Sequence, residues 1–339
     1  MSAVAAKSLP SATIAPGIAR TIGAGVAGLG GKRALLVTDA GLTGAGITGQ
    51  IEEYITSAGV ECIVYDKVEA NPTMSVVEGG ISILRGLGSM DDVVIVSLGG
   101  GSSMDAAKAM AVAAPDGGAI VDYCMVPKLK EGTDHIDMMS MAPKRIAKVP
   151  ALPIIAIPTT SGTASETNGA SVLTDEETHR KLIFSNEAAV AKMTLLDPEL
   201  TLKLPAYPTA TCGMDALTHA TEALTSNRQN PYSDSIAIGS IQLVAKWLPI
   251  LMADLYNLDA RYNIQLASHM AGVAFGIAGL GICHSVGHPL SALLGKAHGQ
   301  TLSTMLPHVM AFNMPVSFAV ASVASLSRFA HRTPYCTQV

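Results

Sequence analysis

The sequence has little charge and no excess of basic residues. Of its 339 residues, 14% are charged, and the formal net charge is -5 at pH 7. A chain with this balance has no basic face for a phosphate backbone, so nucleic acid is not expected as a partner. Sparse charge, 49% hydrophobic residues and a mean hydropathy of +0.37 predict a large core and apolar surface hidden between subunits. We therefore expect a homo-oligomer, a dimer or higher.

Cysteine is scarce, and no two cysteines form a C-x-x-C pair. The five cysteines lie at positions 62, 124, 212, 283 and 336. This scatter argues against a disulfide framework and a thiolate zinc site, and it fits a reducing compartment. The N-terminal MSAVAAKSLPSATIAPG lacks the long apolar core of a secretory signal, and the longest apolar stretch, Met270 to Cys283, is too short to span a bilayer. We expect a soluble, cytoplasmic protein with no membrane partner.

The first half of the chain alternates short β-branched runs with helix-length segments. The strand candidates are residues 34–39, 61–68, 92–100 and 153–160, and helical patterns such as 44–59 and 74–88 lie between them. Apolar runs separated by crossover helices predict an α/β domain with a parallel sheet that is covered on both faces.

After about Leu204 the strand pattern stops. The remainder predicts successive helices rich in Ala, Leu, Ile and Met, with breaks at Asn230-Pro231, at Gly279 to Gly281 and at Pro307. The expected domains are therefore a nucleotide-binding α/β domain over residues 1–203 and an all-helical domain over residues 204–339.

A glycine run stands between the strand candidate 92–100 and an amphipathic helix, in VVIVSLGGGSSMDAAKAMAV. Gly99, Gly100 and Gly101 would let the backbone approach a pyrophosphate, and the N–H groups at the helix N-terminus would supply donors. A tight turn from strand to helix also explains three glycines, but their place after a strand favours a phosphate cradle. Asp105 and Lys108 complete a G-G-G-S-x-x-D-x-x-K string.

Two other strand ends carry polar groups. The loop IPTTSGTASETN offers the hydroxyls of Thr159, Thr160 and Thr163, which suit either cofactor phosphates and ribose or simple helix capping. Asp39, in LLVTDAG, stands where a carboxylate accepts hydrogen bonds from the adenosine ribose, and it would repel a 2′-phosphate, which favours NAD over NADP. The alternative is a turn-forming Asp before Gly41.

Five polar residues predict a divalent metal site without cysteine. Asp215 and His219 lie one helical turn apart in GMDALTHATEAL, and His284, His288 and His298 fall within fifteen residues in GICHSVGHPLSALLGKAHGQ. Residues i and i+4 share a helix face, so the first pair can present a carboxylate oxygen and an imidazole nitrogen to one point. Polar pairs inside apolar segments are costly to bury without a purpose.

The spacing does not assign a role to each histidine. His284 and His288 are one turn apart if their segment is helical, so both could bind metal or one could relay a proton. Pro289 disfavours a continuous helix through His288. A metal held without thiolate, in a chain that also has a nucleotide-binding loop, suggests hydride transfer.

Four ordered motifs resemble those of the iron-containing, group III alcohol dehydrogenases. They are GGGSSMDAAK, PTTSGTASE, GMDALTHATEAL and GICHSVGHPLSALLGKAHGQTLSTMLPHVMAFN, and the resemblance runs from about residue 10 to about residue 315. It implies a dehydroquinate synthase-like fold, in which an N-terminal dinucleotide-binding α/β domain is followed by a helical metal domain. The active site of that fold lies in the cleft between the two.

The resemblance also implies a role for each site residue. The implied metal ligands are Asp215, His219, His284 and His298, which hold Fe²⁺ or, in some relatives, Zn²⁺. His288 would lie beside them, close to substrate and nicotinamide. The implied NAD-binding residues are Asp39, Asn71, Gly99, Gly100, Gly101, Ser102, Asp105, Thr159, Thr160, Thr163 and Lys181.

The activity that the resemblance implies is hydride transfer between small primary alcohols or diols, or the matching aldehydes, and NAD(H). The metal acts as a Lewis acid on the substrate oxygen, and His288 or a nearby water conducts the hydroxyl proton. A zinc glycerol dehydrogenase and a cyclising lyase resembling dehydroquinate synthase share the fold, but the HSVGHPLSALLGKAHG string fits the iron-type enzymes better.

Family members continue for several helices beyond PHVMAFN, whereas this chain stops at Val339. An inactive nucleotide-binding or oligomeric family member is therefore the alternative from another class.

Overall fold

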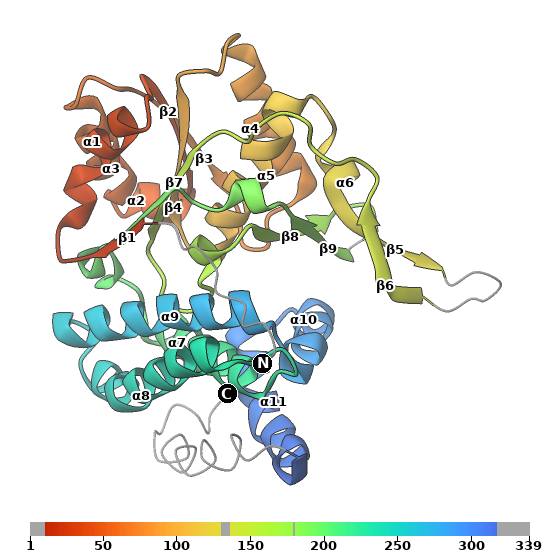
Figure 1. The fold of residues 1–339 in the computed structure, drawn as a ribbon. Helices are drawn as coiled ribbons and strands as arrows, with labels where there is room; N and C mark the ends of the chain where they lie inside the picture. The colour runs from red at the N-terminus through yellow and green to blue at the C-terminus, as the bar shows by residue number, and fades with distance from the viewer. Residues whose placement is uncertain (1–10, 130–135, 179, 317–339) are drawn as a thin grey trace.

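The computed structural model describes residues 11–129, 136–178 and 180–316. Figure 1 shows a sheet-containing part above a layer of helices. The last strand ends at Leu196, and the long helices begin at Ala206. The tail that the sequence assigns to the end of the helical domain, residues 317–339, lies outside the described residues.

The main sheet has six parallel strands, and the sequence predicts the four that lie side by side at one end of it. In spatial order the strands are β1 (Ser11–Ile14), β10 (Met193–Leu196), β7 (Ile154–Pro158), β4 (Val93–Gly99), β2 (Arg33–Asp39) and β3 (Glu61–Val68). The other two, β1 and β10, were not predicted because each has only four residues and too little pattern to stand out.

Helices cover both faces of this sheet, as predicted. On one face lie α1 (Ile22–Gly28) and α3 (Ile47–Thr56), and on the other lie α4 (Met74–Gly86) and α5 (Gly101–Asp116). Strand β4 is buried along its whole length, since it has a helix layer on each side. Helix α3 buries Ile47, Ile51 and Ile55, which recur at the i, i+4, i+8 spacing of one helical face.

A second sheet was not predicted, so the expectation of a single parallel sheet was incomplete. Its antiparallel order is β6 (Ile136–Pro143), β5 (Cys124–Leu129), β9 (Arg180–Ser185) and β8 (Ala170–Asp175). The hairpin β8–β9 contacts the loop after β3, because the backbone N–H of Thr174 donates to the carbonyl of Pro72. The hairpin thereby places Lys181 next to the same loop.

The short connecting elements are α2 (Ala40–Gly44), α6 (Ile120–Tyr123) and the 3-10 helices η1 (Ile18–Thr21), η2 (Ser165–Thr167), η3 (Glu187–Ala189), η4 (Pro198–Thr201) and η5 (Met314–Val316).

The helical part consists of five long helices in the described residues. They are α7 (Ala206–Thr225), α8 (Pro231–Ala253), α9 (Leu258–Ala278), α10 (Ile282–Leu294) and α11 (His298–Asn313). Helix α7 packs against α8, α9 and α11. The predicted break at Asn230-Pro231 is confirmed, since Asn230 and Ser233 form a capping box at the start of α8. The predicted break at Gly279 to Gly281 is confirmed as the link between α9 and α10.

Two expectations based on proline were wrong. Helix α11 continues through Pro307, and α10 continues through Pro289. Proline removes one helical hydrogen bond and strains the turn before it, but packing outweighs this when the adjacent turns are buried. In α11 the buried neighbours are Leu306, Val309 and Met310. Because α10 is continuous, His284 and His288 lie one turn apart on one helix.

Helix α8 is the one helix of the described residues that is long and apolar enough to cross a membrane. Within an apolar 18-residue stretch of this helix, 33% of the residues are buried inside the protein. It lies along α7 and α9 in the helical layer (Figure 1). A core helix of a helical bundle meets the same criterion of length and composition.

Candidate metal and dinucleotide site

The register of the main sheet brings two polar loops together. Strands β4 and β7 are paired so that Gly99 lies opposite Pro158, and the backbone N–H of Thr159 donates to the carbonyl of Gly99 over 2.9 Å. Asp39 ends the neighbouring strand β2 at the same edge. The carboxyl ends of adjacent parallel strands are where such folds bind dinucleotides.

The glycine run is packed so closely against neighbouring side chains that Gly99 and Gly101 have little room for a Cβ. Gly99 has φ +145°, and a Cβ there would lie 2.5 Å from the Ser103 hydroxyl oxygen. At Gly101 a Cβ would lie 2.9 Å from the Thr163 methyl carbon. Gly100 is the N-cap of α5 and supplies no side-chain cap. The first-turn amides of α5 therefore have no side-chain acceptor from the N-cap and can serve an anion.

The hydroxyls of the second loop differ in their contacts. The Thr163 hydroxyl accepts from the backbone N–H of Ser165 over 3.4 Å, a local bond at the turn that leads into η2. The Thr160 hydroxyl is buried and has no hydrogen-bond partner within the described residues. It lies next to Gly100, whose added Cβ would be 3.4 Å from it. Thr159 is buried beside them.

Two carboxylates of the predicted cofactor site are engaged within the protein. Asp39 Oδ1 accepts from the backbone N–H of Leu42 over 3.0 Å and caps α2, as the turn-forming alternative expected. Asp105 uses both oxygens, accepting from the Ser165 hydroxyl over 2.6 Å and from the Val172 backbone N–H over 2.9 Å. Asp105 thereby fastens η2 and β8 to α5.

Three other predicted cofactor residues are linked to one another. Asn71 has φ +59°, in the left-handed region that asparagine adopts more readily than most residues other than glycine. Its backbone N–H donates to the Ser102 hydroxyl over 3.2 Å, and its side-chain oxygen accepts from Lys181 Nζ over 2.8 Å. Burial lowers the pKa of Lys181 from its ordinary value.

The predicted metal ligands converge in the helical part. Asp215 and His219 lie on α7, His284 lies on α10, and His298 is the first residue of α11. The Nε2 atoms of His219, His284 and His298 lie 3.6, 3.5 and 3.9 Å from the same atom, Asp215 Oδ1. Three imidazoles thus surround one carboxylate oxygen.

The donor atoms of this cluster fit a divalent cation. Asp215 Oδ1 and His284 Nε2 are buried and lack a hydrogen-bond partner among the described residues, which is costly unless another group satisfies them. One ligand atom from each of Asp215, His284 and His298 lies within 4.8 Å of the others. His219 is outside that group of three, but it contacts Asp215 and its Nδ1 lies 3.2 Å from the Gly162 carbonyl oxygen.

The charges in the cluster also suit a cation. Burial acts to raise the pKa of Asp215, but the charges of the surrounding His219, His298 and His284 bring it well below the ordinary value. Burial lowers the pKa of His219 to about 4, against the charge of Asp215. Burial opposes protonation of His284 as well, yet the nearby carboxylates of Asp215 and Glu222 raise its pKa to about 9. A positive charge is therefore favoured beside Asp215, and a metal ion can supply it.

His288 packs against the histidine cluster. Its ring stacks on that of His298, with centroids 4.6 Å apart, and lies 5.8 Å from that of His284. Burial and the nearby charges of His298, His284 and Lys181 lower the pKa of His288 to about 3. Its imidazole is therefore neutral near pH 7.

Two residues that contact these ligands were not predicted from the sequence. Glu222, on α7, receives a short hydrogen bond from His284 Nδ1. Phe275, on α9, stacks on the His219 ring with centroids 4.5 Å apart. The signal for Glu222 was present, because Asp215, His219 and Glu222 follow the i, i+4, i+7 spacing of one helical face. Phe275 had no such signal.

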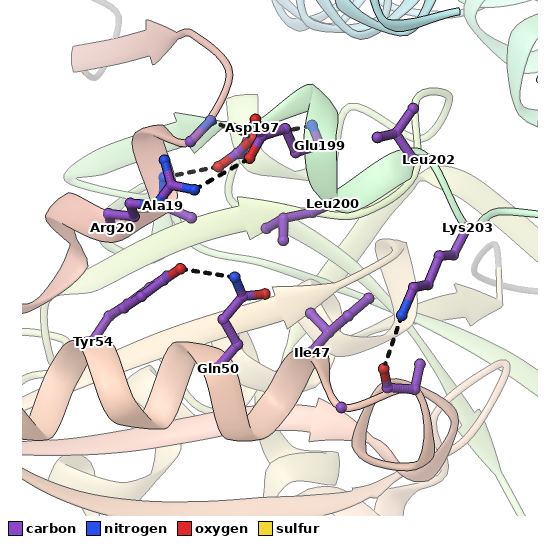
Figure 2. Close-up of a pocket in the computed structure, with 13 residues that line it drawn as sticks. Ala19, Arg20, Ile47, Gln50, Tyr54, Asp197, Glu199, Leu200, Leu202 and Lys203 are labelled. Atoms are coloured by element: carbon purple, nitrogen blue, oxygen red, sulfur yellow. Dashed lines mark hydrogen bonds and ion pairs between the residues drawn. The ribbon is translucent and has the colours of Figure 1, made fainter. Parts of the chain in front are cut away.

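A cavity of about 220 Å³ lies elsewhere, between η1, α3 and η4. Figure 2 shows its polar side chains turned toward partners: the Gln50 amide meets the Tyr54 hydroxyl at 2.7 Å, and Lys203 Nζ meets the Ala45 carbonyl at 3.3 Å. None of the residues predicted for the metal or the cofactor lines this cavity.

Comparison with family models gives two matches that together span most of the chain. A model described as iron-containing alcohol dehydrogenase matches residues 10–198, and one described as Fe-containing alcohol dehydrogenase family, C-terminal, matches residues 209–332.

Named relatives and solved structures point the same way. An NAD-dependent methanol dehydrogenase of Bacillus methanolicus is 34% identical over 322 residues, which cover 95% of this chain and 77% of that protein. A 1,3-propanediol dehydrogenase of Klebsiella pneumoniae is 37% identical over 296 residues, covering 86% of this chain and 71% of the relative. A crystal structure of a 1,3-propanediol oxidoreductase superposes with a TM-score of 0.81 at 32% identity, covering 95% of this chain and 85% of the other.

Proposed function

Because this chain belongs to the iron-containing alcohol dehydrogenase family and is an NAD-dependent oxidoreductase, we propose that it interconverts small primary alcohols or diols and the matching aldehydes. The observation that carries the proposal is the convergence of three imidazole Nε2 atoms on Asp215 Oδ1, at 3.5 to 3.9 Å, with buried donors that lack partners. Asp215, His219, His284 and His298 are the proposed ligands of the family's iron.

The proposed chemistry divides between the metal, the nucleotide and the side chains. A divalent iron, when bound there, supplies Lewis-acid charge that lowers the pKa of an alcohol hydroxyl, and the nicotinamide supplies the hydride acceptor. Asp215 contributes the anionic ligand, and the stacked rings of His219, His284 and Phe275 shield it from water. The oxygen and nitrogen donors suit Fe²⁺, and they suit Zn²⁺ as a second metal.

The cofactor residues divide into two proposed groups. The amides at Gly100 and Gly101, at the N-terminus of α5, hold the pyrophosphate, and the Thr160 hydroxyl donates to the nucleotide. Asp39, Asn71, Ser102, Asp105, Thr159, Thr163 and Lys181 complete the proposed set. The contacts of Asp105 and Asn71 support a part in holding the loops in place.

His288 is the proposed proton-handling residue. Since its imidazole is neutral near pH 7, one ring nitrogen can accept the hydroxyl proton or the hydrogen bond of a water that carries it. Replacing His288 by Ala should lower kcat about a hundredfold while the bound metal per chain stays at the wild-type value. Elemental analysis beside steady-state kinetics tests this, and a His288→Ala protein that loses its metal would make His288 a ligand instead.

The substrate class is tested by a panel of alcohols under metal control. The protein is reconstituted anaerobically with Fe²⁺ or with Zn²⁺, and NADH formation is followed with methanol, ethanol, butanol, 1,2-propanediol, 1,3-propanediol and glycerol. We expect turnover of primary alcohols and diols, faster with Fe²⁺. NAD⁺ binding without turnover of any alcohol would support the inactive, nucleotide-binding alternative instead.

Location and assembly are part of the proposal. The described cysteines, Cys62, Cys124, Cys212 and Cys283, are all unpaired, which supports a cytoplasmic protein. The low charged fraction supports a homo-oligomer, and light scattering on the purified protein measures its size.

A further inference from the structure

A buried glutamate joins the two helices that carry most of the proposed metal ligands. Glu222 lies on α7, seven residues after Asp215, and is 2% exposed. Its carboxylate faces the start of α10, where Oε1 accepts from the backbone N–H of Cys283 over 2.6 Å and Oε2 from that of His284 over 3.3 Å. Oε2 also meets His284 Nδ1 in a short hydrogen bond.

The first role of this carboxylate is to cap α10. The N-cap residue of α10 is Gly281, which has no side chain to satisfy the first-turn amides. Glu222 does so from the neighbouring helix, and its negative charge is favourable at the positive end of the helix dipole. A Cβ at Gly281 would lie 2.8 Å from Glu222 Oε1, so the glycine is what lets the carboxylate come this close.

The second role concerns the imidazole of His284. With Nδ1–H donated to Glu222, the free lone pair of the neutral ring is on Nε2, and Nε2 lies 3.5 Å from Asp215 Oδ1. That same Nε2 is buried without a hydrogen-bond partner in the described residues. The carboxylate thus selects the tautomer and the ring orientation that present Nε2 to the cluster.

We propose that Glu222 is a positioning residue of the metal site, which fixes the tautomer and orientation of His284 while holding the N-terminus of α10 against α7. The inference rests on the proposed function, because it takes His284 as a metal ligand. Carboxylates that orient a ligand histidine change metal affinity by about 10- to 100-fold when they are replaced.

A matched control is available in the same protein. Glu166 is also a buried carboxylate that pairs with a histidine, since its Oε1 lies 3.1 Å from His269 Nδ1. His269 is not one of the proposed ligands. Replacing each glutamate by Gln removes one buried charge from one glutamate–histidine pair, so a general effect of buried-charge loss appears in both variants.

The experiment compares metal binding in wild type, Glu222→Gln and Glu166→Gln. The dissociation constant for Zn²⁺ is measured by competition with a chelator, and the visible spectrum of the Co²⁺-loaded protein reports the ligand geometry. We expect Glu222→Gln to bind Zn²⁺ about 10- to 100-fold more weakly, with a changed Co²⁺ spectrum, and Glu166→Gln to match wild type in both. Circular dichroism verifies that each variant is folded.

The outcomes separate this inference from the proposed function. If wild type binds Zn²⁺ and Co²⁺ but Glu222→Gln keeps the wild-type affinity and spectrum, the positioning role is wrong and Glu222 only caps α10. An equal loss in both Gln variants would also overturn it. If wild type itself binds neither ion, the proposed metal site fails. Should Glu222→Gln not fold, Gly281→Ala, which moves the carboxylate without removing it, is expected to give the same weaker binding and altered spectrum.

Discussion

Replacing Asp215 by Asn is expected to strip the protein of its metal and to lower kcat/KM on the order of a thousandfold. Asp215 supplies the one anionic oxygen on which three imidazoles converge. Asn has nearly the same shape, so the change removes the charge and leaves the packing of α7 intact. Without that charge the three imidazoles have no anion to offset a cation, and the Lewis-acid contribution is lost. Metal per chain and steady-state kinetics are the measurements.

The matched control for Asp215→Asn is Asp116→Asn. Asp116 is another buried carboxylate that accepts several hydrogen bonds, among them from Tyr123 and the backbone of Lys148, in a network away from the histidines. We expect Asp116→Asn to cost stability and to keep its metal. If Asp215→Asn retained wild-type metal content and turnover, the cluster around Asp215 would not be the catalytic metal site.

Gly99→Ala is expected to weaken NAD⁺ binding several hundredfold. At φ +145° a residue with a Cβ is strained, and the added atom would lie 2.5 Å from the Ser103 hydroxyl oxygen and 3.5 Å from Asp39 Oδ2. The loop must shift, and α5 would no longer meet the phosphates with its first amides. Several hundredfold corresponds to about 3.5 kcal/mol, at about 1.4 kcal/mol per tenfold change. Titration calorimetry with NAD⁺ measures the effect.

The control for Gly99→Ala is a glycine with open space around it. Gly49 lies on the exposed side of α3, and a Cβ there meets no atom within 4 Å. Gly49→Ala should raise the free energy of unfolding by about 0.5–1 kcal/mol, because alanine is the better helix former, and should leave NAD⁺ binding unchanged. Wild-type NAD⁺ affinity in Gly99→Ala would remove the glycine run from the cofactor site.

The sequence predicted those parts of the fold whose pattern is local. The central strands of the main sheet are long apolar runs, and the helices on both faces have regular spacing, so both could be found from periodicity. The antiparallel sheet could not, because the pairing that joins its two local strand pairs, β5–β6 and β8–β9, links distant parts of the chain: Cys124 lies opposite Phe184. Nothing near either residue in the sequence records that pairing.

Part of the candidate site could likewise be predicted from local spacing, and part depends on how the helices pack. Helical spacing placed Asp215 and His219 on one face of α7, and the structure brings His284 and His298 to the same carboxylate oxygen. The contact of Glu222 with the start of α10 depends on how two helices cross, which spacing does not encode. Proline rules failed at Pro289 and Pro307 because tertiary packing outweighed a local preference.

One hydrogen bond of His219 joins the proposed metal site to the proposed nucleotide loop. His219 Nδ1 lies 3.2 Å from the carbonyl oxygen of Gly162, in the loop next to the glycine run. Gly162 in turn packs closely on α7, since a Cβ there would lie 2.6 Å from the carbonyl oxygen of Cys212. In the proposed enzyme, this imidazole would therefore bind the metal through one ring nitrogen and hold the nucleotide loop through the other. A metal ion that fixes the ring would also order the loop, so the binding of metal and the binding of nucleotide would strengthen each other by equal amounts.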